Sequence, residues 1–184
     1  MILLRHGQSE FNVHFSATRR DPGIADPKLT PLGHEQARRA AEALAIEPIR
    51  RVIASPYTRA LQTAAPLVRR LGLPLTINSL VRERFAFTCD VGSPRTKLVL
   101  AWPEHDFSRL EEIWWSPVEE PLSSVAARAA LFRSEMAALP DWRETVVVSH
   151  WGFILHLAGQ SVENGTWLYC DPTAPAPVAP PWQS

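Results

Sequence analysis

Short apolar runs alternate with amphipathic stretches along most of the chain. The apolar runs are continuous and rich in β-branched side chains, the pattern of strands buried on both faces of a sheet; they cover residues 2–4, 51–55, 75–77 and 145–149. The stretches between them have the spacing of helices; they cover residues 32–44, 56–71, 94–102, 122–139 and 152–158. A last strand is expected over residues 166–170.

Local signals mark several ends of these elements. Thr30 followed by Pro31 is an N-cap with proline in the first helical turn. Gly72 ends the helix that begins after the second strand. Residues 16–29 are polar and rich in turn-forming residues, so we expect a long surface loop there.

The alternation predicts an α/β fold, a three-layer sandwich in which helices cover both faces of a mostly parallel central sheet. The chain has 184 residues, which fits one domain, and we place that domain at residues 1–170. Residues 171–184 contain five prolines, which exclude a helix or strand interior, so we expect a flexible tail.

Composition excludes some classes of partner. Nineteen basic residues balance nineteen acidic ones, so no net field attracts nucleic acid or an anionic membrane. The two cysteines, Cys89 and Cys170, are far apart, and two free thiols suit a reducing compartment. The first apolar run is too short for a signal peptide. We therefore expect a cytoplasmic protein, monomeric or homodimeric, with no nucleic-acid or membrane partner.

Charged and polar side chains follow the predicted strands. Arg5 and His6 follow the first strand, Arg59 lies one helical turn after the second, Glu83 follows the third, and His150 follows residues 145–149. Parallel strands present their carboxyl ends at one edge of a sheet, so we expect these five side chains to converge there.

That set of side chains suits phosphoryl transfer. Cationic donors stabilise the negative charge on a phosphoryl group in flight, and a neutral imidazole can attack phosphorus. A carboxylic acid can protonate the leaving oxygen. The residue types leave open a zinc ion bound by His6, His150 and a cysteine, although no local ligand spacing favours it.

Four ordered segments resemble one family. Residues 5–12 (RHGQSEFN) are similar to the R-H-G-[EQ]-[ST]-x-x-N opening of the histidine phosphatase, or phosphoglycerate-mutase-like, superfamily. Residues 29–37 resemble its L-[ST]-x-x-G-x-x-Q-A block, residues 55–64 its S-x-x-x-R-[AT]-x-Q-T-A block, and residues 147–152 its V-[ST]-H-x-G block. Together these segments reach across about four-fifths of the chain.

The resemblance implies a role for each matching residue. His6 would be the nucleophile, Arg5 and Arg59 would bind the phosphoryl oxygens, and His150 would be the second histidine of the pocket, both catalytic and phosphate-binding. Asn12 matches an asparagine near the family's pocket and is expected to bind phosphate.

Glu83 stands where one branch of the family has its proton donor after the third strand. This chemistry requires no metal, and the sequence shows none of the usual carboxylate clusters for magnesium, so we expect no metal and no other cofactor. We expect hydrolysis of a small phosphorylated metabolite through a phosphohistidine on His6.

Two other functions stay open. Cofactor-dependent phosphoglycerate mutases are similar in the four blocks, but their acid lies in an N-E-R-x-Y-G segment, and residues 82–87 (RERFAF) lack its tyrosine and glycine. A catalytically weak phosphate-binding scaffold protein is the other alternative.

Residues 80–121 have the least clear periodicity of the chain, and we expect them to form a Trp-rich insertion over the active site. Trp102, Trp114 and Trp115 lie in this insertion. They are expected either to cover the mouth of the pocket or to pack the insertion onto the sheet, and the sequence does not separate these alternatives.

Overall fold

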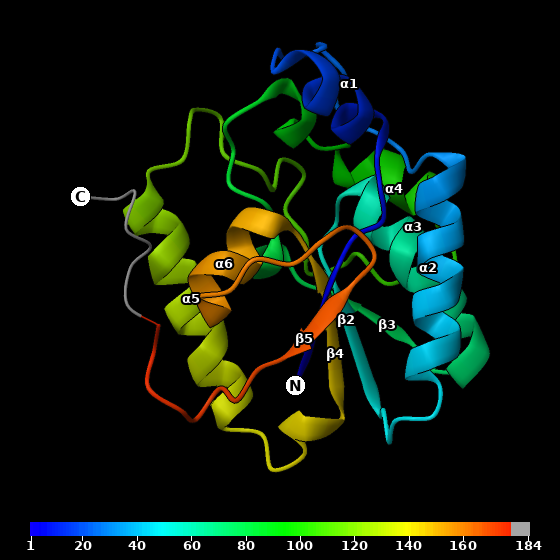
Figure 1. Ribbon diagram of the computed structural model, residues 1–184, viewed down its shortest axis with the longest axis vertical. Helices are drawn as coiled ribbons and strands as arrows, with labels where there is room; N and C mark the ends of the chain where they lie inside the picture. The colour runs from blue at the N-terminus through cyan, green and yellow to red at the C-terminus, as the bar shows by residue number, and fades with distance from the viewer. Residues whose placement is uncertain (178–184) are drawn as a thin grey trace.

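The computed structural model describes residues 1–177, and its centre is a five-stranded sheet (Figure 1). Its strands are β1 (Ile2–Arg5), β2 (Arg51–Ala54), β3 (Leu75–Ile77), β4 (Thr145–Ser149) and β5 (Trp167–Tyr169). Their order across the sheet is β3-β2-β4-β1-β5. The first four run parallel, and β5 pairs antiparallel with β1 at one edge. A mostly parallel sheet is therefore confirmed.

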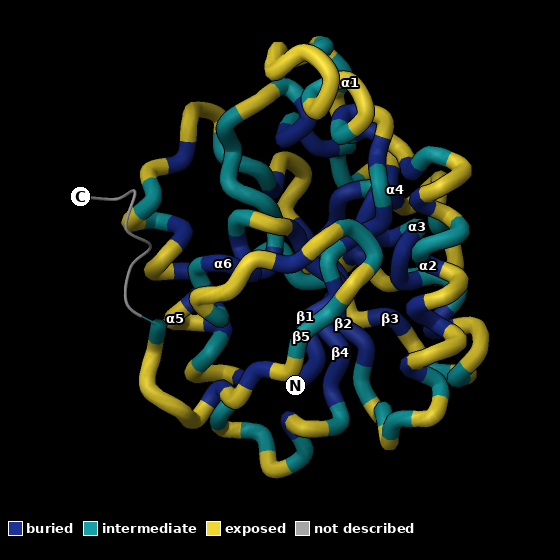
Figure 2. The backbone as a smooth tube through the Cα atoms, in the orientation of Figure 1, coloured by how far each residue is buried: buried dark blue, intermediate teal, exposed yellow. Residues whose placement is uncertain are grey.

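Side chains of alternate strand residues enter two separate apolar cores. Ile2 and Leu4 of β1 belong to one core, while Leu3 belongs to the other. Strands β1, β2 and β4 are almost continuously buried (Figure 2). Strands buried on both faces need helices on both faces, and this explains why their sequences are apolar without interruption.

The helices complete three layers and confirm the predicted fold class. The first core lies under α2 (Pro31–Leu44), α3 (Thr58–Leu71) and α4 (Arg95–Ala101). The second lies under α5 (Leu122–Ala137) and α6 (Trp151–Ala158). Three short 3₁₀ helices, η1 (Ser79–Val81), η2 (Thr88–Asp90) and η3 (Trp142–Glu144), lie in the connections.

Helix α1 (Glu10–Thr18) corrects the predicted loop over residues 16–29. The helix covers the first three of those residues, so the loop begins after Thr18. The helix begins at a capping box in which Asn12 N–H donates to Ser9 Oγ and Ser9 N–H donates to Asn12 Oδ1. It lies above the carboxyl edge of the sheet, apart from the other helices (Figure 1).

Residues 80–121 divide into two parts. Residues 83–90 approach the carboxyl edge of the sheet, whereas Trp102, Trp114 and Trp115 pack on the core beneath α3 and α4. Trp114 is buried, with its ring 4.6 Å from the ring of Tyr57. The structure therefore supports the second alternative for these tryptophans, in which they pack the insertion onto the sheet.

The chain after β5 is irregular as far as it is described. Arg133 on α5 donates hydrogen bonds to the carbonyls of Asp171 and Ala174, which ties residues 171–174 to that helix. The rest of the predicted flexible tail, residues 178–184, lies outside the described residues. Within residues 1–177, no helix has both the length and the apolar character needed to cross a bilayer.

Candidate active site

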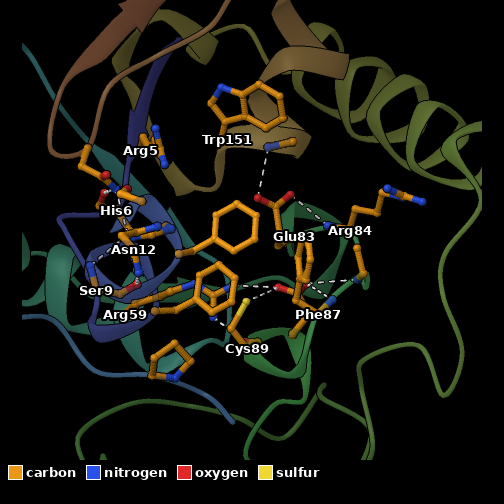
Figure 3. Close-up of a pocket in the computed structure, with 18 of the residues that line it drawn as sticks. Arg5, His6, Ser9, Asn12, Arg59, Glu83, Arg84, Phe87, Cys89 and Trp151 are labelled. Atoms are coloured by element: carbon orange, nitrogen blue, oxygen red, sulfur yellow. Dashed lines mark hydrogen bonds and ion pairs between the residues drawn. The ribbon is translucent and has the colours of Figure 1, made fainter. Parts of the chain in front are cut away.

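A cavity of about 620 Å³ opens at the carboxyl edge of the sheet, between α1, the η2 segment and the start of α6 (Figure 3). Four residues predicted from the strand ends line it: Arg5, His6, Arg59 and Glu83. Asn12 on α1 lines it as well. The predicted side chains have thus come together from four segments of the chain, as the parallel topology requires.

His6 lies at the base of the cavity, directly after β1. Its Nδ1 lies 2.7 Å from the carbonyl oxygen of Gly7, which can only accept, so the ring proton is assigned to Nδ1. Nε2 is then the nitrogen with a free lone pair. Burial, with the charges of Arg59 and Arg5, lowers the pKa of His6 well below its ordinary value. The imidazole is therefore neutral at physiological pH.

His150 lies behind His6 and is fully buried. The two rings are 5.1 Å apart, and His150 Nε2 lies 2.8 Å from Ser55 Oγ at the end of β2. Its Nδ1 is buried and has no hydrogen-bond partner among the described residues. Burial and the charge of Arg59 lower its pKa well below the ordinary value.

Two guanidinium groups flank the histidines. Arg5 donates from Nη1 to the carbonyl oxygen of Val162 at 2.8 Å, while its Nε is buried without a partner in the described part of the chain. Arg59 comes from the first turn of α3 and is 3% exposed. It donates from Nη1 to the carbonyl oxygen of Cys89 at 2.8 Å.

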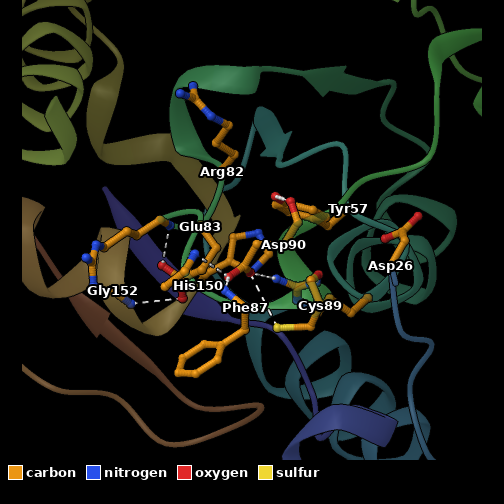
Figure 4. A network of polar contacts seen from close by, with 12 residues as sticks. Asp26, Tyr57, Arg82, Glu83, Phe87, Cys89, Asp90, His150 and Gly152 are labelled. Carbon is orange, nitrogen blue, oxygen red and sulfur yellow. Dashed lines mark hydrogen bonds and ion pairs between the residues drawn. The ribbon is translucent and has the colours of Figure 1, made fainter. Parts of the chain in front are cut away.

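Asp90 holds Arg59 in place. Its Oδ1 lies 3.1 Å from Arg59 Nη2, and its Oδ2 accepts hydrogen bonds from the backbone N–H groups of Ala86 and Phe87, both at 3.1 Å (Figure 4). The Arg59 guanidinium also lies over the ring of Tyr57, 4.2 Å from its centroid. With these partners on one side, the orientation of Arg59 toward the cavity is fixed.

Glu83 lies on the opposite side of the cavity from His6 (Figure 3). Its carboxylate accepts from the backbone N–H groups of Gly152 at 3.1 Å and Phe153 at 3.2 Å, in the first turn of α6, and of Arg84 at 2.9 Å. Burial and the charge of Asp90 raise the pKa of Glu83, whereas these hydrogen bonds oppose the shift. The net direction is upward, which favours the protonated acid.

The segment that carries Glu83 is itself fixed from α5. Arg128 donates to the carbonyl oxygens of Leu80 and Arg82, at 2.5 and 3.1 Å. The same guanidinium forms a bidentate pair with Glu120, with both distances at 2.8 Å. Because this pair is buried, the backbone around Glu83 has little freedom to move.

Asn12 has its amide oriented by the capping box of α1. Its Oδ1 accepts from Ser9 and, at 3.3 Å, from Asn164 Nδ2. The amino group of Asn12 is consequently the part of the side chain that is available to a ligand.

Comparison with known proteins agrees with this arrangement. A sequence model of the histidine phosphatase superfamily (branch 1) matches residues 1–174. The chain belongs to that superfamily.

Several of its relatives cover most of its length. The glucosyl-3-phosphoglycerate phosphatase of Mycolicibacterium vanbaalenii is 33% identical over 176 residues, which is 89% of this chain and 76% of that protein. The structure of the mycobacterial glucosyl-3-phosphoglycerate phosphatase with VO3 superposes with a TM-score of 0.66 at 27% identity, covering 91% of this chain and 88% of that one. A 2,3-bisphosphoglycerate-dependent phosphoglycerate mutase of Methylobacterium sp. is 42% identical, but over 46% of this chain and 41% of its own length.

Several motif residues of this histidine phosphatase have a structural role in the loop after His6. Gly7 and Gly33 approach so closely that a Cβ on Gly7 would collide with the backbone of Gly33, and one on Gly33 with that of Gln8. Gln36 Oε1 accepts from the backbone N–H of Gln8 at 2.7 Å. Thr63 Oγ1 accepts from the N–H of Gly7 at 3.1 Å. These contacts hold the loop after His6.

The histidine phosphatase site has no metal-binding set among residues 1–177, where no three His, Cys, Asp or Glu side chains are grouped to hold an ion. Cys89 is buried, and burial raises the pKa of its thiol, which makes it a poor nucleophile.

Three features of the site were not predicted from the sequence. Asp90 is one, because an aspartate in an irregular segment has no pattern of its own. Asp26 is another: it accepts from Thr58 N–H at 2.9 Å and so caps the helix that carries Arg59. The third is a wall of phenylalanines. Phe11 and Phe15 are an i, i+4 pair, a signal that could have revealed the wall had residues 10–18 been read as a helix.

Proposed function

We propose that this histidine phosphatase is a phosphomonoesterase that hydrolyses a small phosphorylated metabolite through a phosphohistidine on His6. One observation carries the proposal: the buried nitrogens Arg5 Nε and His150 Nδ1 have no partner among the described residues, while Arg5 lines the cavity with His6 and the His150 ring lies 5.1 Å from the His6 ring. Buried donors without partners are costly, and a phosphoryl oxygen is the acceptor that such a cationic site favours.

In the first step His6 Nε2 attacks phosphorus while the bond from phosphorus to the ester oxygen breaks. Arg5, Arg59 and Asn12 stabilise the charge on the equatorial oxygens. Ser55 Oγ–H can donate to His150 Nε2, which places the ring proton of His150 on Nδ1, where it donates to the phosphoryl group. The Glu83 proton passes to the departing alcohol oxygen.

In the second step water attacks the phosphohistidine. The Glu83 carboxylate accepts a proton from that water, the bond from His6 Nε2 to phosphorus breaks, and inorganic phosphate leaves. His6 is again neutral and Glu83 again protonated, so the cycle is balanced with water as the only co-reactant.

Trapping the intermediate tests this mechanism. Rapid acid-free quenching with a ³²P-labelled ester should leave alkali-stable, acid-labile phosphate on wild-type protein, and His6→Ala should lose both the label and hydrolysis. His34→Ala, an exposed histidine on α2, is the matched control and should behave as wild type. Undiminished turnover by His6→Ala would end the assignment of the nucleophile.

Substrate and acceptor need separate assays. Glucosyl-3-phosphoglycerate is the first compound to test, because relatives 31–33% identical carry its name. The local match to a mutase makes phosphoglycerate mutase activity the alternative. Measuring both the release of inorganic phosphate and the interconversion of phosphoglycerates separates the two activities.

A further inference from the structure

Three phenylalanines form one wall of the active-site cavity. Phe11 and Phe15 of α1 stack with their ring centroids 5.1 Å apart, and Phe87 lies 5.6 Å from Phe11 and 5.1 Å from Phe15. Phe11 is 8% exposed and anchors the group, whereas Phe87 is 39% exposed. Phe11 is thus packed into the protein, while the partly exposed ring of Phe87 faces the cavity.

Trp151 lies across the cavity, at the first position of α6. Its side chain is fixed by a hydrogen bond from the indole Nε1 to Ser161 Oγ at 2.8 Å, yet the residue is 41% exposed. Among the exposed large hydrophobic residues that the structure describes, three are aromatic, and two of these, Phe87 and Trp151, line this one cavity. Exposed aromatic groups gathered in a cleft mark a binding surface rather than ordinary surface scatter.

The cavity has one end where the phosphoryl group would bind. His6, Arg5 and Arg59 form that end, and the volume of about 620 Å³ far exceeds one phosphoryl group. The remainder of the lining includes the rings of Phe11, Phe15, Phe87 and Trp151, together with polar side chains such as Ser16, Arg19 and Arg84. Aromatic walls bind flat faces, through stacking and edge contacts with an aromatic ring or through the C–H face of a sugar ring.

We propose that the wall formed by Phe11, Phe15 and Phe87 binds a ring in the alcohol part of the substrate, so that the enzyme prefers phosphate monoesters of ring-bearing alcohols to short acyclic ones. This inference rests on the proposed phosphomonoesterase activity. It adds a specificity that neither the phosphate-binding residues nor Glu83 would give, since those groups contact only the phosphoryl group and the ester oxygen.

Esters of primary alcohols test the inference without a difference in leaving-group chemistry. Benzyl phosphate and glucose 6-phosphate carry an aromatic and a sugar ring, and n-butyl phosphate carries none. Wild-type kcat/KM for at least one ring ester should exceed that for n-butyl phosphate by about three- to tenfold, the range expected for one aromatic contact. The ring ester that is preferred identifies the kind of ring.

Phe87→Ala should remove the preference by raising KM for the ring ester, with n-butyl phosphate little changed. Phe87→Leu, which keeps apolar bulk without a flat ring, should remove most of it. Leu100→Ala, at an 83% exposed position on α4, is the matched control and should keep the preference. If Phe87→Ala does not fold, Phe15→Ala on α1 decides in its place.

Equal kcat/KM of wild-type protein for ring and acyclic esters would overturn the inference and leave the phosphomonoesterase intact. An equal loss on all three esters in the folded Phe87 variants would do the same. A wild-type protein that hydrolyses none of the esters would overturn both the inference and the proposed function.

Discussion

Asp90→Asn should destabilise the folded protein strongly although it changes one atom. Both carboxylate oxygens of Asp90 accept: Oδ1 faces Arg59, and Oδ2 faces the backbone N–H groups of Ala86 and Phe87. An asparagine amide has one accepting oxygen. Whichever way it is turned, its NH₂ group faces donors, so either Arg59 or the two backbone groups lose their acceptor.

The size of the effect follows from burial. The side chains of Arg59 and Asp90 are both 3% exposed. Removing one partner of a buried pair typically costs about 3–5 kcal/mol, because the other charge is left without compensation. Asp141 offers the matched control, since it forms a bidentate pair with Arg51 but its side chain is 36% exposed. Solvent screens an exposed pair, so Asp141→Asn should lose far less stability than Asp90→Asn.

Urea unfolding followed by tryptophan fluorescence and by far-ultraviolet circular dichroism measures both variants. Coincident transitions with an unchanged slope assign the difference to the free energy of unfolding. The folded Asp90→Asn protein should also lose kcat/KM for every ester, since Arg59 is no longer held. A loss of stability below about 1 kcal/mol, or one equal to that of Asp141→Asn, would refute the reasoning from burial.

Four further predictions concern the chemistry. Burial and the charge of Asp90 raise the pKa of Glu83, and burial and the charge of Arg59 lower the pKa of His6 well below its usual range. Hydrolysis of alkyl phosphates should therefore fall as the pH rises through the Glu83 pKa, because the proton donor is lost. It should also fall at acid pH, where His6 becomes protonated. Glu83→Gln should remove the alkaline fall from the pH profile and slow esters of poor leaving groups far more than activated ones; an equal effect on both would assign the acid elsewhere. Gly152→Ala would place a Cβ 2.5 Å from Glu83 Oε1, so it should displace the acid and mimic Glu83→Gln while inhibition by vanadate is retained; loss of vanadate inhibition would contradict this. Prolonged dialysis against EDTA should leave activity unchanged, and a loss restored by added metal would show a metal requirement.

The layers of the fold could be predicted because their signals are local. The run from Thr145 to Ser149 is β-branched and uninterrupted, and Gly72 ends α3 in the left-handed conformation with φ of 64°. The direction of β5 could not be read in the same way. Trp167–Tyr169 has the composition of any strand, and only its pairing with β1 shows that it runs antiparallel.

The site was predictable to the extent that it depends on strand ends. Arg5 and His6 directly follow a parallel strand, and Arg59 follows one after a single turn, so topology alone brings them together. The groups that orient them depend on contacts between distant segments. Asp90 meets Arg59 across 31 positions, and Arg128 reaches Glu83's segment across 45 or more, which no local pattern encodes. Trp114 is a similar case. The sequence shows that a tryptophan is present, but not that its ring packs against Tyr57.

The contacts of Asp90 connect the phosphate-binding residues to the aromatic wall. One oxygen of its carboxylate holds Arg59, and the other holds the backbone of Phe87, so the same group fixes the phosphate end of the cavity and the end that would contact the alcohol. Helix α1 has a similar double position, since it carries Asn12 beside His6 and Phe11 within the wall. Changes to the side chains of Phe11, Phe15 and Phe87 can therefore reshape the alcohol-binding end alone, whereas a change at Asp90 disturbs both ends. The nucleophile His6 depends on the end of β1, whereas the proposed choice of alcohol depends on α1 and on the segment that carries Phe87.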